Sequence, residues 1–117
     1  MAHPSTKSRQ GPRSKKARSD CWVARSLDIV GDRWTLLVIR DMLFAAKRRY
    51  GDFLDSAEGI TTNILAERLK RLEREGLVKK VLYSEHPPRW EYHLTPKGKA
   101  LEPAIRALFD WGKQHLG

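Results

Sequence analysis

The sequence predicts a mainly α-helical domain that carries one small β-hairpin, an α+β fold of 117 residues. Apolar residues recur every three or four positions in four successive segments between residues 20 and 75, which is the period of an amphipathic helix. The apolar period changes to two within residues 77–94 and returns to helical spacing after residue 95. A chain of this length suits one domain, which we expect over residues 20–117.

The first predicted helix spans residues 21–30, where Val23 and Leu27 lie on one face. Asp20 stands at the position of an N-cap, and Gly31 at that of the left-handed residue that commonly ends a helix. We therefore expect the ordered chain to begin just before Asp20.

The second and third predicted helices form the middle of the chain. The second, residues 33–44, is apolar almost all round, which is typical of a helix at the centre of a domain. The third is short, residues 50–57, with Tyr50 and Phe53 pointing inward, and residues 58–60 form a tight turn after it.

The fourth predicted helix begins at Thr61 or Thr62, either of which can cap it, and ends before Gly76. Its narrow apolar stripe has helical spacing and consists of Leu65, Leu69 and Leu72. The stripe leaves the opposite face of this helix polar and basic.

Two strands are predicted next, over residues 77–83 and 90–94. Pro87 and Pro88 stand between them, and two consecutive prolines lack the N–H groups that a strand ladder needs. We therefore expect residues 84–89 to form an exposed loop.

The last predicted helix begins at Thr95-Pro96, an N-cap followed by a proline in the first turn. Pro103 falls inside its pattern, which predicts a kink or a weakened turn. The helix has more apolar width than one small core requires, which indicates an interface. Its apolar residues are Leu101, Ala104, Ile105, Leu108, Phe109, Trp111 and Leu116.

A short helix, a tight turn, a polar-faced helix and a two-stranded hairpin together make up a winged helix-turn-helix. The chain has 23 Lys and Arg against 14 Asp and Glu, a net charge of +9. Such a charge favours a polyanion as partner, although solubility or a membrane surface would also explain it. Because the predicted fold is a winged helix-turn-helix, we favour nucleic acid among these explanations of the charge.

Residues 1–19 are basic and have no apolar periodicity, so we interpret them as a disordered arm. Their cationic residues are Lys7, Arg9, Arg13, Lys15, Lys16 and Arg18. The arm either adds non-specific affinity for DNA or is simply a solvated tail.

The polar face of the fourth helix is the candidate DNA-reading surface, because the start of the second helix of a helix-turn-helix meets base edges. Thr61, Thr62 and Asn63 occupy that end; Asn can read adenine, and Thr can donate, accept or touch a thymine methyl. The candidates for contacts to the DNA backbone are Lys70, Arg71 and Arg74, with Arg89 in the wing. The alternatives are a solvated basic face and an Arg89 that only pairs with Glu85 or Glu91.

Other classes of protein are disfavoured. The sequence has no phosphate-binding glycine loop, no set of nucleophile and base, and no metal-ligand spacing among its four histidines and one cysteine. We therefore expect neither an enzyme nor a cofactor. No apolar run is long enough to span a membrane or to form a signal peptide, and the single cysteine excludes an internal disulfide, so a cytoplasmic location is expected.

With these segments in place, the chain resembles the HxlR-type winged-helix regulators of bacteria and archaea, relatives of the MarR group. The resemblance covers about residues 21–112 and departs from the family pattern at Gly51-Asp52-Phe53. The matching segments are Cys21, Leu27–Trp34, Arg49–Phe53, Gly59–Leu65, Leu69–Leu72, Glu75–Val78 and Pro87–Gly98.

The resemblance implies a homodimer, formed largely by the first and last helices, on a palindromic site in double-stranded DNA. The expected interface residues are Val23, Leu27, Leu101, Ile105, Leu108 and Trp111. For Cys21, the resemblance implies a redox or electrophile sensor, since some members of the family sense through a cysteine near the first helix. The alternative is that Cys21 is a small apolar residue at the dimer seam. An alternative function is a winged helix that binds only proteins, and RNA binding is disfavoured because the tryptophans fall mainly on core or interface faces.

Overall fold

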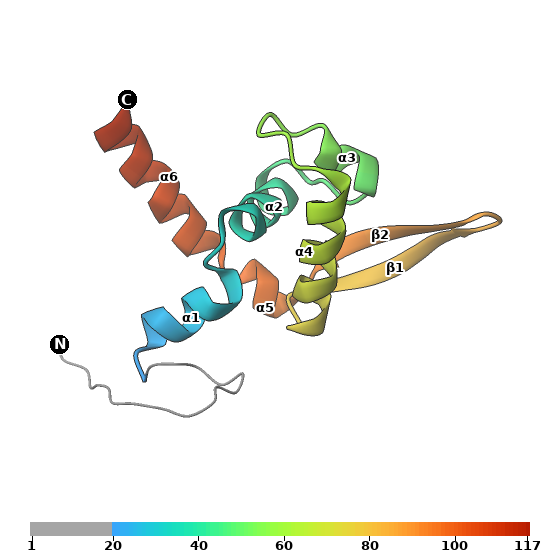
Figure 1. The fold of residues 1–117 in the computed structure, drawn as a ribbon, viewed down its shortest axis with the longest axis horizontal. Coiled ribbons are helices and arrows are strands. Elements are labelled where there is room, and N and C mark those ends of the chain that lie inside the picture. The colour runs from blue at the N-terminus through green and yellow to red at the C-terminus, as the bar shows by residue number, and fades with distance from the viewer. Residues whose placement is uncertain (1–19) are drawn as a thin grey trace. The chain divides into compact units, whose positions relative to one another are not determined.

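The computed structural model describes residues 20–117, so the arm predicted for residues 1–19 lies outside the described residues (Figure 1). The chain divides into one unit that ends at Arg33 and a second that spans Trp34–Gly117. The helices are α1 (Trp22–Val30), α2 (Arg33–Phe44), α3 (Tyr50–Leu54), α4 (Thr62–Arg74), α5 (Pro96–Lys99) and α6 (Glu102–Leu116), and the strands are β1 (Val78–Glu85) and β2 (Pro88–Leu94). The mainly helical fold with one hairpin confirms the predicted fold class.

Helix α1 confirms the first predicted helix and its end at Gly31, but the predicted N-cap and the predicted left-handed conformation of Gly31 were wrong. The N-cap position is Cys21 rather than Asp20, and its side chain makes no capping hydrogen bond. Gly31 is right-handed, with φ of −77°, because its N–H still donates to the carbonyl of Leu27 in the helical manner. A Cβ at Gly31 would lie 2.4 Å from that carbonyl oxygen, so glycine is needed here for space.

The core of the second unit forms around α2, as its nearly all-round apolar pattern predicted. Val38, Ile39 and Met42 of α2 are buried, together with Phe53 of α3. Helix α3 ends at Leu54, three residues earlier than predicted. Ser56, two residues after the end of α3, donates its hydroxyl proton to the carboxylate of Asp41 on α2.

Helix α4 follows its predicted limits. Thr61 is the N-cap, and its hydroxyl oxygen accepts a hydrogen bond from the N–H of Ile64 (3.3 Å). Leu65, Leu69 and Leu72 are buried, and Gly76, with φ of +80°, ends the helix in the left-handed conformation that glycine adopts readily. The stripe fixes which face of α4 is left to solvent.

The hairpin is longer than predicted. Strands β1 and β2 pair antiparallel from Val78–Leu94 to Glu85–Pro88, with an irregularity between Leu82 and Ser84. The expected loop over residues 84–89 was wrong, because only His86 and Pro87 form the turn. Pro88 is the first residue of its strand, where a missing N–H costs no internal ladder bond.

The predicted last helix is two helices. Helix α5 begins as expected, with the hydroxyl oxygen of Thr95 accepting from the N–H of Gly98 (3.2 Å). The kink predicted at Pro103 is instead a complete break, and α6 starts at Glu102. A new helix start places Pro103 in the first turn, where its absent N–H has no intrahelical partner to lose.

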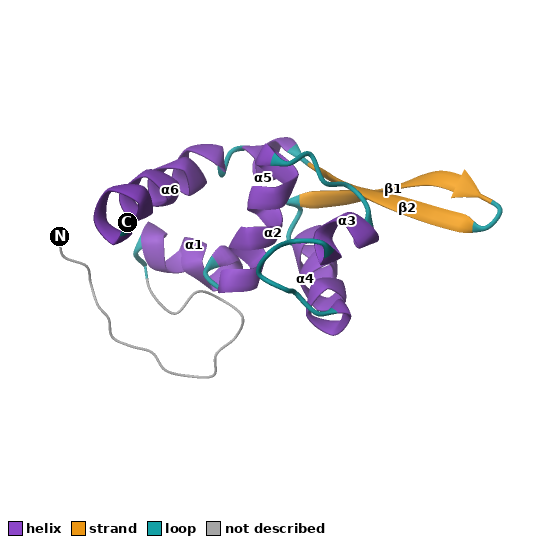
Figure 2. Ribbon diagram, turned by 90° about the horizontal axis from the view of Figure 1, so that it is seen from above, coloured by secondary structure: helices purple, strands orange, loops and turns teal. Residues whose placement is uncertain are grey.

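Within the second unit, the hairpin and α6 project in opposite directions, and α4 lies between them (Figures 1 and 2). No helix within residues 20–117 is long and apolar enough to cross a membrane.

Candidate nucleic-acid interface

The first turn of α4 presents three short polar side chains together. Thr61, Thr62 and Asn63 are all exposed, as the sequence predicted from the buried stripe on the other side. The N–H groups of a helix's first turn lack intrahelical acceptors, so this end also offers backbone donors to an anion.

The basic residues farther along α4 divide into two kinds. Lys70 and Arg74 are exposed. Arg71 is half-buried, and its Nη2 donates to the hydroxyl oxygen of Thr35, a completely buried residue of α2 (3.3 Å). Arg71 therefore ties α4 to α2, a role that spacing along one helix does not reveal.

Tyr50 of α3 holds the start of α4 from the other side. Its hydroxyl donates to the carbonyl oxygen of Thr62 (3.1 Å). A tyrosine is protonated at neutral pH in any case, and burial raises the pKa of Tyr50 further. The sequence predicted only that Tyr50 points inward.

The turn between α3 and α4 is bound to α2 by a cluster of charged groups, which we call the Asp41 cluster: Arg40, Asp41, Lys47, Ser56 and Glu58. Asp41 is 6% exposed, and its two carboxylate oxygens accept from Arg40 (2.7 and 3.0 Å, both to Oδ1) and from the hydroxyl of Ser56. Lys47 lies 3.7 Å from Asp41 and donates to Ser56 (3.1 Å).

Arg40 extends the Asp41 cluster to the residues just before α4. Its Nη1 and Nη2 each donate to one oxygen of Glu58, both at 2.9 Å. The hydrogen bonds to Glu58, and then those to Asp41, raise the pKa of Arg40 above its usual range. One guanidinium thus bridges a carboxylate of α2 and a carboxylate of the turn, a geometry that suits the planar fork of Arg.

The wing exposes Arg89 beside the turn of the hairpin. Glu91, one of the two carboxylates suggested as its partner, instead contacts Arg49 (3.2 Å) and His93 (3.0 Å). The hydrogen bond to His93, and then that to Arg49, lower the pKa of Glu91. Arg89 is thus exposed beside the turn, while Glu91 is engaged with Arg49 and His93.

The base of the wing is attached to the segment before α3. The N–H of Tyr92 donates to the carbonyl of Arg48 (2.8 Å), and the guanidinium of Arg49 lies 4.0 Å from the ring centre of Tyr83. These contacts connect the hairpin to the helix-turn-helix at one end and leave its tip projecting.

The residues expected at a dimer interface differ in exposure. Val23 and Leu27 of α1 and Leu108 and Trp111 of α6 are all more than half exposed. Ile105, by contrast, is buried in the core of its own chain. Leu101 and Cys21 are intermediate, and Cys21 is not in a disulfide.

Comparison with known proteins gives consistent matches. The family model of HxlR-like helix-turn-helix proteins matches residues 29–117. An HTH-type transcriptional regulator of Synechocystis sp., sll1512, is 36% identical over 96 residues, which are 82% of this chain and 70% of the relative. An HTH-type transcriptional regulator of Mycobacterium tuberculosis, Rv3095, is 43% identical over 94 residues, which are 80% of this chain but only 58% of the relative.

Among solved structures, the redox regulator HypR in its oxidised form superposes with a TM-score of 0.73 and 32% sequence identity. The similarity covers 81% of this chain and 97% of HypR. The arrangement of helices and hairpin is therefore shared with a regulator over nearly its whole length.

The Asp41 cluster can be tested with Arg40→Lys. Lysine keeps the charge but cannot bridge two carboxylates with a planar fork, so we expect the free energy of unfolding in urea to fall by about 1–2 kcal/mol. Arg106→Lys is the matched control. Arg106 and Glu102 form an exposed ion pair within α6, so this substitution should lower the free energy of unfolding by less than about 0.5 kcal/mol. Equal losses for the two variants would show that the cluster does not hold the turn.

Proposed function

The chain belongs to the HxlR-like helix-turn-helix family of DNA-binding transcriptional regulators, and we propose that it binds a palindromic operator in double-stranded DNA as a homodimer. The observation that carries this proposal is the exposed polar start of α4, followed in the chain by a hairpin with an exposed arginine beside its turn. The two are the parts that a winged helix-turn-helix presents to DNA.

In this proposal α4 lies in the major groove with its first turn against the bases. Asn63 is the strongest base reader, since its amide can both donate to and accept from adenine. Thr62 contacts the base edges next to those that Asn63 contacts. The hydroxyl oxygen of Thr61 already accepts from Ile64, so Thr61 contributes mainly as a donor through its hydroxyl proton.

Contacts to phosphates come from the exposed cations. Lys70 and Arg74 hold the backbone beside the groove that α4 occupies, and Arg89 holds it beside the wing. Arg71 supports α4 through Thr35. The basic residues before Ser19 add affinity that does not depend on sequence.

Homodimerisation is supported by the exposed apolar side chains of α1 and α6. A monomer seldom leaves so many large apolar groups in water without a partner. Two-fold symmetry would then place two copies of α4 about 34 Å apart, one turn of DNA, on the two halves of a palindrome.

The main test is a salt-titrated binding assay with purified protein, duplex DNA from upstream of its own gene and a scrambled duplex. We expect a specific complex of two chains per site that weakens steeply with salt, because bound cations release counterions from the phosphates. Arg89→Ala should lower the slope of log affinity against log salt by about one, and Lys99→Ala on α5 should leave it unchanged. Equal weak binding to both duplexes would instead favour a winged helix that contacts a protein, the alternative that the polar, basic face of α4 disfavours.

Base reading by Asn63 has a separate test. Asn63→Ala should reduce discrimination by about 1–3 kcal/mol at one base pair in each half-site, measured by fluorescence anisotropy on single-substitution duplexes. Lys70→Ala is the control, since losing a phosphate contact weakens all sequences alike. Unchanged discrimination between base pairs in Asn63→Ala would show that Asn63 does not read bases.

We also propose that Cys21 senses oxidants, because this half-buried thiol stands at the N-cap of α1 and HypR, a structural neighbour, is a redox regulator. A single cysteine per chain limits its oxidation to a disulfide across the dimer, a mixed disulfide or an oxyacid. Diamide should release DNA from the wild-type protein and leave the Cys21→Ser complex intact in the same anisotropy assay. Equal release from both proteins would make Cys21 a structural residue.

A further inference from the structure

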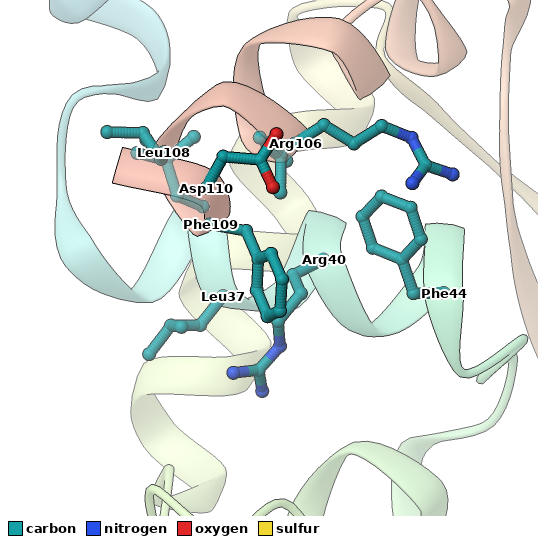
Figure 3. Close-up of a pocket in the computed structure, with 9 residues that line it drawn as sticks. Leu37, Arg40, Phe44, Arg106, Leu108, Phe109 and Asp110 are labelled. Atoms are coloured by element: carbon teal, nitrogen blue, oxygen red, sulfur yellow. The ribbon is translucent and has the colours of Figure 1, made fainter. Parts of the chain in front are cut away.

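An apolar pocket of about 570 Å³ lies between α2 and α6, where Leu37, Phe44 and Phe109 line it (Figure 3). Leu108 also lines this pocket, and it is one of the exposed residues already assigned to the proposed homodimer. We therefore assign no further role to the apolar pocket. Another pocket, with a different chemistry, lies near the C-terminal end of α2.

This other pocket, which we call the polar pocket, has a volume of about 280 Å³ and lies within the second unit. Its lining residues come from α2 (Met42, Leu43), the segment before α3 (Arg48), β2 (His93, Leu94), α5 (Lys99) and the start of α6 (Glu102). Sites for drug-sized ligands hold about 300–1,000 Å³, so the polar pocket suits a molecule of only a few carbon atoms. Neither the reading helix nor the tip of the wing contributes to it.

Two cations of the polar pocket have no carboxylate partner among residues 20–117. Lys99 is exposed and makes no ion pair there, and the guanidinium of Arg48 donates to backbone carbonyls, those of Met42 (3.4 Å) and Lys47 (3.0 Å). The carboxylate in the lining, that of Glu102, is balanced by Arg106, whose Nε and Nη2 both donate to Oε2 (3.1 and 2.8 Å). The polar pocket therefore presents two positive charges to an anion.

We infer that the polar pocket binds a small organic carboxylate, with its acid group between Arg48 and Lys99. The planar fork of Arg matches a carboxylate, and the ammonium of Lys adds a second charged donor. The rest of the lining is hydrocarbon from Met42, Leu43 and Leu94. An inorganic anion would use the two cations alone, whereas an organic acid would also remove its own hydrocarbon from water. The mixed lining therefore favours the organic acid.

The polar pocket borders the contacts that attach the wing. The carbonyl of Arg48 accepts from the N–H of Tyr92 (2.8 Å), and the neighbouring His93, which lines the pocket, lies 3.0 Å from Glu91 through its Nε2. A carboxylate held by Arg48 and Lys99 would join the segment before α3 to α5 across the base of the wing. Bound ligand would thus favour the attached position of the hairpin over any other.

The experiment is an NMR titration of the isotope-labelled full chain with sodium pentanoate, without DNA and against a baseline of sodium chloride at the same concentrations. Pentanoate supplies one carboxylate and a short hydrocarbon chain. We expect saturable shifts at the amides of Arg48, Tyr92 and Lys99, because these residues line the polar pocket or bond to its lining. Pentanol has the same chain without the charge, so it should not produce these shifts.

Charge-removing variants test the two cations. Lys99→Gln and Arg48→Gln should each raise the Kd of pentanoate by at least about tenfold, since each loses a charge-assisted hydrogen bond. Lys113→Gln is the matched control, because Lys113 is exposed on α6 and does not line the polar pocket, so the Kd should not change. Arg48→Gln also loses bonds to two backbone carbonyls, whereas Lys99 is exposed, so Lys99→Gln tests the site in a chain whose fold is undisturbed.

Several results would overturn the carboxylate site. They are the absence of saturable shifts, an unchanged Kd in Lys99→Gln, equal shifts with pentanol, and shifts confined to Leu108 and Phe109 of the apolar pocket. Equal affinity for inorganic phosphate would show that the hydrocarbon contributes nothing, and it would overturn the organic class of ligand. Because the titration contains no DNA, its failure would leave the proposed DNA binding standing, and a failed DNA assay would not alter its result.

Discussion

The buried carboxylate of Asp41 is the constraint on which the placement of the reading helix depends. A carboxylate removed from water is costly unless it is paired and hydrogen-bonded. Asp41 obtains these partners from Arg40 on its own helix and from Ser56 after α3, so the turn can satisfy the carboxylate only by lying on α2. Arg40 then reaches Glu58, three residues before the N-cap of α4. These polar contacts define the position of the start of α4 more narrowly than the apolar packing of Leu65 alone would.

Three independent contacts then orient α4 along its length. The Asp41 cluster fixes the approach to its first turn, Tyr50 holds the carbonyl of Thr62, and Arg71 joins its last turn to Thr35 of α2. The buried stripe sets its rotation. Because both ends and the rotation are determined, the helix backbone at Asn63 is held with this residue on the exposed face, as base reading would require. The wing is also held by specific contacts, but only at one end. Its base is attached to the segment before α3, and its tip is not.

The elements that the sequence predicted well are those whose signals are local. Periodicity and caps gave α2 and the limits of α4, because a stripe, a capping Thr61 and a terminal Gly76 act within one or two turns. The error at Pro103 arose because this residue has two acceptable environments. Pro103 can kink a helix or begin one, and the choice depends on the path of the chain around α5. The links made by Tyr50 and Arg71 depend on which helix lies opposite, so no spacing within one helix predicts them.

The same reasoning limits what net charge says about binding. The cations of this chain have different uses: Arg40, Arg49 and Arg71 hold the fold together, whereas Lys70 and Arg89 face solvent. Only a cation that reaches a phosphate releases counterions, so the salt dependence of binding reflects the outward group and not the total charge. An arginine already held between two carboxylates gains little from a phosphate and would lose both partners to reach one. The charge of the chain therefore indicates the class of partner, and the internal contacts decide which surface meets it.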